Sequence, residues 1–161
     1  MASLGQASHY NFSNAVHVAL YSAMGAGALA MTATQPLLAW QIARHGRGDL
    51  PSAWRDAVVL GLMLTFLLGA GAGGLLGGIQ PPAGAGLPVV GWHLGGGDLR
   101  PAHFIGLHAQ QFLPLAGLAL IALRVRRARV ALAVFALVYS ALWGWAMLRG
   151  LEGAIRVVAP S

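Results

Sequence analysis

The chain has 161 residues, of which 57% are apolar and only 9% are charged. Soluble domains carry roughly 25% charged residues, and a soluble chain of this length could not keep so much apolar surface out of water. Intrinsic disorder is excluded as well, because it requires low hydrophobicity and high charge. The absence of cysteine excludes disulfides, thiolate metal sites, iron–sulfur clusters and a cysteine nucleophile. The composition therefore predicts a small membrane protein.

Four apolar runs are each long enough to cross a bilayer as a helix, which takes about 20 residues. Helices are expected because they satisfy their own backbone hydrogen bonds in lipid. The runs cover about 14–43, 57–78, 102–123 and 130–151, and a loop at 79–101 joins the second run to the third. We expect a single all-α membrane domain over residues 1–161, an up-down bundle of four transmembrane helices.

The placement of arginine predicts the orientation of this bundle. All ten basic residues are arginines, and seven of them lie in two short connections, 44–55 and 124–129. Positive residues in short loops favour the cytoplasmic side, so both termini and the loop 79–101 are expected outside. We therefore expect a multi-pass protein of a bacterial inner (plasma) membrane. The lipid bilayer is its expected partner and nucleic acid is not, because the arginines flank apolar runs.

Histidine is concentrated at the predicted outer side, in His9, His17, His93, His103 and His108. A histidine inside a membrane span is costly and is by default a functional hypothesis. Counting ~1.5 Å per residue from the inner arginines separates an outer layer from a deeper position. The outer layer holds His17, Tyr21, His103 and Glu152, and His108 lies one to two turns deeper.

Two stripes at helical spacing accompany the histidines. The first run carries one that we expect to face the bundle interior, formed by Asn14, His17, Tyr21, Met24, Ala28, Met31 and Gln35. The second run carries small residues at every fourth position, namely Gly61, Thr65, Gly69, Gly73 and Gly77. Such spacing lets helix backbones approach closely in lipid, and it also leaves room for a flat ligand. Because close packing is the commoner use, we expect Gly69, Gly73 and Gly77 to be structural.

Three kinds of ligand site fit these residues. Haem b would be held by two neutral imidazoles from facing helices, His17 with His103 or His108. Copper or zinc would take nitrogen and oxygen ligands, from His17, His103, His108 and Glu152. A quinone or a lipid headgroup would use hydrogen bonds, and the residues that could bind such a cofactor are His17, Tyr21, His103, His108 and Gln111. The histidines could also be structural residues with satisfied hydrogen bonds.

The expected function is electron transfer through an outer histidine site that binds haem b or a metal. The alternatives are a non-catalytic accessory subunit of a membrane complex or a lipid- or quinone-binding protein. The expected partners besides the bilayer are a quinone or a redox partner subunit, and a homo- or hetero-oligomer is compatible with the sequence. No hydrolase, phosphate-loop or metalloprotease motif is present, so the sequence leaves enzymatic activity open.

The segment DLRPAHFIGLHAQQFLP, residues 98–114, resembles an uncharacterised family of bacterial multi-pass membrane proteins. The preceding loop GLPVVGWHLGGGDLR and the NAVH of residues 14–17 are also similar to that family. The resemblance implies a four-helix membrane protein, and it implies no particular reaction. The residues that it marks as special are Asp98, Arg100, His103, His108 and Gln111. Independently of the resemblance, Asp98 is placed to cap the third helix.

Overall fold

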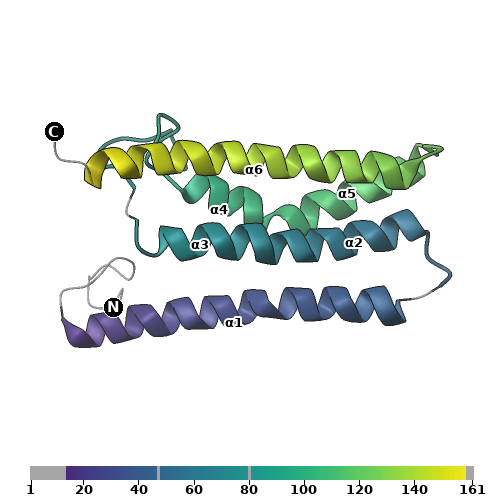
Figure 1. Ribbon diagram of the computed structural model, residues 1–161, viewed down its shortest axis with the longest axis horizontal. Coiled ribbons are helices and arrows are strands. Elements are labelled where there is room, and N and C mark those ends of the chain that lie inside the picture. Colours follow the sequence, from purple (N-terminus) through teal and green to yellow (C-terminus); the bar gives the residue numbers. More distant parts are fainter. Residues whose placement is uncertain (1–13, 47, 80, 159–161) are drawn as a thin grey trace.

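The computed structural model describes residues 14–46, 48–79 and 81–158, the last four of these by their backbone alone, so His9 lies outside the described residues. Within this part, all regular structure is helical, as the sequence predicts (Figure 1). The helices are α1 (Ala15–His45), α2 (Ser52–Leu64), the π-helix η2 (Thr65–Ala70), α3 (Gly71–Leu76), α4 (Arg100–Leu107), α5 (Ala109–Ala122) and α6 (Ala128–Val158).

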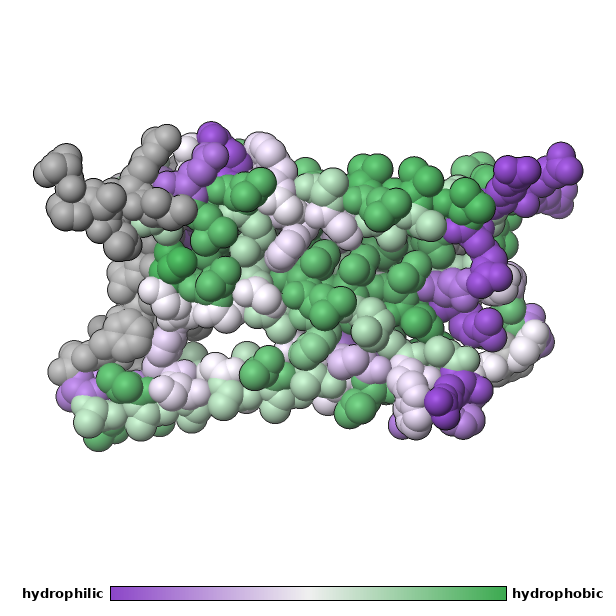
Figure 2. All heavy atoms as spheres, in the orientation of Figure 1, coloured by the Kyte–Doolittle hydropathy of each residue, from purple (hydrophilic) through white to green (hydrophobic). Residues whose placement is uncertain are grey.

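Three of the described helical stretches are long and apolar enough to cross a membrane: Ala15–His45, Ser52–Leu76 and Ala128–Ala154. A fourth candidate is the pair α4 and α5, which is bent by 48° at His108. By helix length and hydropathy, the chain is therefore a candidate multi-pass membrane protein with three to four spans. Figure 2 shows the apolar side chains over the middle of the molecule and a hydrophilic group at one end.

The bent pair runs from one end of the bundle to the other. At its start, the Gly97 amide donates a hydrogen bond to the Arg149 carbonyl, near the end of α6. At its finish, Leu120 lines a cavity together with Ser52 and Ala128, at the beginnings of α2 and α6. The pair thus has the course of one broken helix rather than of a re-entrant loop. The arginine end is the end of the bundle that holds residues 48–52 and 122–130, and the Asp98 end is the end that holds residues 81–99.

The predicted third helix is continuous, but the structure interrupts it at one residue. His108 has φ −88° and ψ 0°, outside the helical range, and ends α4 while it begins α5. Pro114 lies inside α5, six residues after the break. Side chains of neighbouring helices, Thr65 and Tyr139, supply hydrogen bonds to the backbone groups that the break leaves without a helical partner.

Small residues bring the candidate span Ser52–Leu76 into backbone contact with the bent pair α4 and α5. A Cβ atom on Gly61 would lie 3.1 Å from the Ala109 carbonyl oxygen, and one on Gly117 would lie 2.5 Å from the Ala57 Cβ. Where Gly106 of α4 meets Gly69 of η2, a Cβ on Gly106 would lie 2.5 Å from the Gly69 nitrogen. This close approach is the packing mode that membrane helices use when hydrophobic burial does not distinguish lipid from protein.

Helix α1 is attached to the bundle only in part. Tyr21 near its start is partly buried, and its hydroxyl donates to the Gly77 carbonyl at 2.9 Å. Residues 22–31, nearly three turns of the helix, are all exposed, so neighbouring helices do not cover this part of α1 on any face. From residue 32 onward the helix again has partly buried positions, and Ala39 is buried. Figure 2 shows the resulting opening between α1 and the rest of the molecule.

This attachment corrects the expectation for the first stripe. Tyr21 and Gln35 are partly buried, but Met24 and Met31 between them are 43% and 72% exposed. The stripe therefore borders the opening in its middle part instead of packing in the bundle interior.

Candidate functional site

His103 lies in α4, partly buried, against the small-residue face of η2 and α3. Its Nδ1 is 2.9 Å from the Gly69 carbonyl oxygen. A Cβ atom on Gly73 would lie 2.8 Å from the imidazole Cε1, so only glycine leaves room for the ring. The imidazole is thereby fixed in position by a backbone carbonyl on one side and a glycine on the other.

His108 lies at the break between α4 and α5. Its Nδ1 is 2.9 Å from the Phe104 carbonyl oxygen, one turn earlier in the same chain segment. The ring stacks on the Phe104 ring, with centroids 3.8 Å apart and planes inclined by 27°. This side chain therefore supports the C-terminal end of α4.

The hydrogen bonds of these two histidines determine their tautomers. A carbonyl oxygen can only accept, so Nδ1 carries the hydrogen in both His103 and His108. In the neutral form of the ring, which has one N–H and one lone pair, this leaves Nε2 as an acceptor. The same assignment is typical of imidazoles that ligate iron or accept a ligand's proton.

Two buried hydroxyls satisfy the backbone where α4 and α5 separate. The Gln110 amide, near the start of α5, donates to Thr65 Oγ1 at 2.9 Å. The Tyr139 hydroxyl donates to the Ile105 carbonyl in α4. Both side chains are buried, with 1% and 8% of their surfaces exposed. Irregular backbone is tolerated inside an apolar bundle only where such partners exist. Thr65 and Tyr139 therefore stabilise the break between α4 and α5.

Removal of either hydroxyl should lower the stability of the protein without unfolding it. Tyr139→Phe leaves the Ile105 carbonyl unsatisfied, and Thr65→Val does the same to the Gln110 amide; we expect a loss of ~1 kcal/mol each. Thermal unfolding in detergent measures the effect. The matched control is Ser140→Ala, because the Ser140 hydroxyl donates to the Ala136 carbonyl one turn earlier in its own helix. Equal effects at Ser140 and Tyr139 would contradict the assignment.

The stripe of small residues is occupied by protein atoms at the positions that could have received a flat ligand. Gly61 packs against the beginning of α5, Gly69 packs against the end of α4, and Gly73 packs against the His103 ring. Gly77 faces the Tyr21 hydroxyl, which a Cβ would approach to 3.8 Å. His103 and Tyr21 thus contact the second candidate span one turn apart, at Gly73 and Gly77.

The residues proposed for a metal site do not form such a group in the described part of the chain, where no three His, Cys, Asp or Glu side chains come together to hold an ion. Glu152 instead pairs with Arg149 at 2.9 Å. His17 lies one turn beyond Tyr21, whereas His103 lies one turn to the other side of it. The two histidines are therefore separated by roughly 12 Å along the helix axes, at 1.5 Å per residue. Gln111 is exposed.

A buried ion pair fixes the loop at the Asp98 end. The Asp98 side chain is fully buried, and its Oδ2 accepts from Arg100 Nη2 at 2.7 Å and from the His93 amide at 2.9 Å. Its Oδ1 accepts from the Arg100 amide at 3.0 Å, at the start of α4. Arg100 Nη2 also donates to the Gly91 carbonyl at 2.7 Å. The pair therefore ties the loop to the first turn of the helix that carries His103.

The pKa of Asp98 reflects this environment. Burial raises the pKa, but the hydrogen bonds from the Arg100 side chain and from the His93 and Arg100 amides lower it, as does the positive charge of Arg100. The lowering effects are larger together, so the pKa of Asp98 lies below its usual range. The carboxylate remains ionised although it is buried.

Sequence reasoning did not single out Tyr139, and it placed Thr65 only among the small residues. The available signal was chemical, since each is a hydroxyl in an otherwise apolar run and must find a partner in lipid. No protein-family model, curated protein sequence or solved structure matches the chain.

Proposed function

We propose that this protein binds a quinol, the reduced form of a lipid-soluble quinone, in the opening between α1 and the bundle. The observation that carries the proposal is the hydrogen bond between His103 Nδ1 and the Gly69 carbonyl, which leaves Nε2 of the neutral ring as a hydrogen-bond acceptor. A quinol hydroxyl is a donor and matches this acceptor, whereas the oxidised quinone has only acceptor oxygens.

The surroundings support a ligand that arrives from the membrane. The opening is bounded by the exposed turns 22–31 of α1, and Met24 and Met31 give it a flexible apolar wall. Gln35, one turn further along α1, has a buried Oε1 without a hydrogen-bond partner among the described residues. At the other limit of the opening, the Tyr21 hydroxyl donates to the Gly77 carbonyl at 2.9 Å. Apolar walls with a few polar acceptors are typical of small-ligand sites.

Haem b is the second candidate, because the lone pair of His103 Nε2 is also what an iron atom would take. The described residues favour the quinol, since protein atoms fill the glycine stripe and His17 and His103 lie at different heights. Copper and zinc have less support, because no group of three ligands comes together among the described residues.

The location that fits this function is a bacterial inner membrane, with the arginine end in the cytoplasm. A periplasmic reporter enzyme fused after Arg127 should then be inactive, and one fused within the loop at the Asp98 end should be active. The reverse pattern would overturn the orientation.

Binding of a short-chain benzoquinol to detergent-purified protein tests the function. His103→Leu removes the acceptor, and we expect quinol affinity to fall about fivefold to tenfold, which corresponds to one hydrogen bond. The wild type should bind the oxidised quinone more weakly than the quinol. His45→Leu at the arginine end is the matched control and should change neither affinity.

Equal affinity of the wild type and His103→Leu, both folded by thermal unfolding, would overturn the proposal. A haem absorption band in the purified protein that disappears in His103→Gln would replace the quinol with haem b. A colourless protein that binds neither would favour an accessory subunit.

A further inference from the structure

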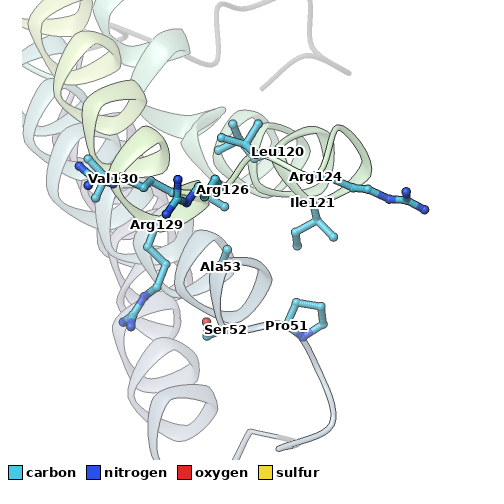
Figure 3. A pocket seen from close by; sticks show the side chains of 12 residues that line it. Pro51, Ser52, Ala53, Leu120, Ile121, Arg124, Arg126, Arg129 and Val130 are labelled. Atoms are coloured by element: carbon cyan, nitrogen blue, oxygen red, sulfur yellow. The ribbon is translucent and has the colours of Figure 1, made fainter.

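A cavity of about 750 Å³ opens at the arginine end, between the beginning of α2 and the turn that joins α5 to α6. Figure 3 shows Leu120 and Ile121 from the last turn of α5 on one side and Pro51, Ser52 and Ala53 on the other. The rim is basic, formed by Arg124, Arg126, Arg127 and Arg129. The cavity therefore combines apolar walls, continuous with the spanning helices, and a cluster of positive charges at the membrane boundary.

Most of this positive charge has no ion-pair partner among the described residues. Arg129 Nε forms an ion pair with Asp56 at 2.6 Å, which directs that side chain toward α2. In the part of the chain that the structure describes, no carboxylate pairs with Arg124, Arg126 or Arg127. The three side chains are exposed, and an anion that binds beside them would be favoured by their positive charge.

The backbone of Arg124 gives a second, independent observation. The Arg124 amide donates to the Ile121 carbonyl and the Val125 amide to the Leu120 carbonyl, which ends α5 in a Schellman motif. That motif requires a left-handed residue, and Arg124 takes φ 53°. Glycine is the usual residue there because a side chain is strained in this conformation. An arginine at the position places a guanidinium on the cavity rim at a cost in stability.

We propose that this cavity binds the phosphate headgroup of an anionic phospholipid. A phosphodiester takes hydrogen bonds from guanidinium groups, and basic pockets between membrane helices at the cytoplasmic surface suit such headgroups. The apolar walls formed by Leu120, Ile121 and Val130 lie where the acyl chains of the same molecule would run. A free phosphate ion would use the arginines and leave these walls without a role.

The test uses the detergent-purified full chain and follows its melting temperature with added phosphatidylglycerol, phosphatidylcholine or inorganic phosphate. Phosphatidylglycerol should raise the melting temperature at lower concentration than phosphatidylcholine, and inorganic phosphate should have little effect. Arg126→Gln should weaken the apparent affinity for phosphatidylglycerol about fivefold. Arg44→Gln is the matched control, because it removes the same charge from the same end but outside the cavity, where Arg44 lies over the Trp40 ring.

Arg124→Gly separates the two roles of that residue. It relieves the strained backbone and removes a cation, so the lipid-free melting temperature should stay the same or rise while phosphatidylglycerol affinity falls about fivefold. Equal responses to the two lipids would overturn the proposal. So would an Arg44→Gln variant as weak as Arg126→Gln, which would indicate a diffuse charge effect, or full stabilisation by inorganic phosphate alone. None of these outcomes bears on quinol binding near the other end.

Discussion

Replacing Gly106 with alanine should abolish the folded, monodisperse protein. The new Cβ would lie 2.5 Å from the Gly69 nitrogen and 2.6 Å from the Leu68 carbonyl carbon. Both are backbone atoms of η2, so no rotation of a side chain can relieve the overlap. Overpacking of a core by a methyl group costs about 1–3 kcal/mol, and because two helix backbones must separate here, we expect at least ~3 kcal/mol. Size-exclusion chromatography and thermal unfolding in detergent measure the loss.

Gly71→Ala is the matched control for this prediction. It lies one residue beyond η2, and a Cβ there would meet nothing within 4 Å. Because alanine has the higher helix propensity, Gly71→Ala should be neutral or slightly stabilising. A normally folded Gly106→Ala protein would contradict the close approach of α4 and η2, and with it the position of the His103 ring against Gly69.

Replacing Asp98 with alanine should destabilise the Asp98 end by about 2–3 kcal/mol. Loss of one partner of a buried ion pair costs ~3–5 kcal/mol, and the estimate is reduced because the Arg100 side chain is 33% exposed. Asp98→Asn keeps the shape and loses the charge, so it should cost less. Thermal unfolding in detergent, with limited proteolysis of the loop, measures both.

The pH dependence of unfolding gives the same residue a separate signature. The pKa of Asp98 is lower in the folded protein than its usual value. Its contribution to stability is therefore complete above the unfolded pKa of about 3.9. That contribution is lost as the pH falls below this value and through the lower folded pKa. The wild type should lose stability in this range more steeply than Asp98→Asn; identical profiles would contradict the role of the charge.

The sequence allowed the all-α fold and the candidate spans to be predicted because hydropathy acts over whole segments. A helix is the only local solution for a long apolar run in lipid, whatever its neighbours are. The break at His108 could not be predicted in this way. It depends on Thr65 and Tyr139, which lie 45 and 34 residues away from the backbone groups that they satisfy, and no local pattern reveals such partners.

The candidate site shows the same division. His103 could be selected because a polar side chain inside an apolar run is expensive. Its orientation could not, because that depends on the Gly69 carbonyl of another helix. The exposure of α1 at residues 22–31 could not be predicted either, since a stripe that borders an opening has the same residue spacing as one that packs in a core.

The imidazole nitrogens of His103 offer the most direct test of the proposed quinol site. Nitrogen-15 spectra of histidine-labelled protein in detergent distinguish a protonated ring nitrogen from one with a lone pair, and His103→Gln assigns the signals. We expect a protonated Nδ1 and an unprotonated Nε2 at neutral pH, with Nε2 shifting on addition of a short-chain benzoquinol and much less on addition of the quinone. A protonated Nε2, or an Nε2 signal that the quinol leaves unchanged, would contradict the proposed site.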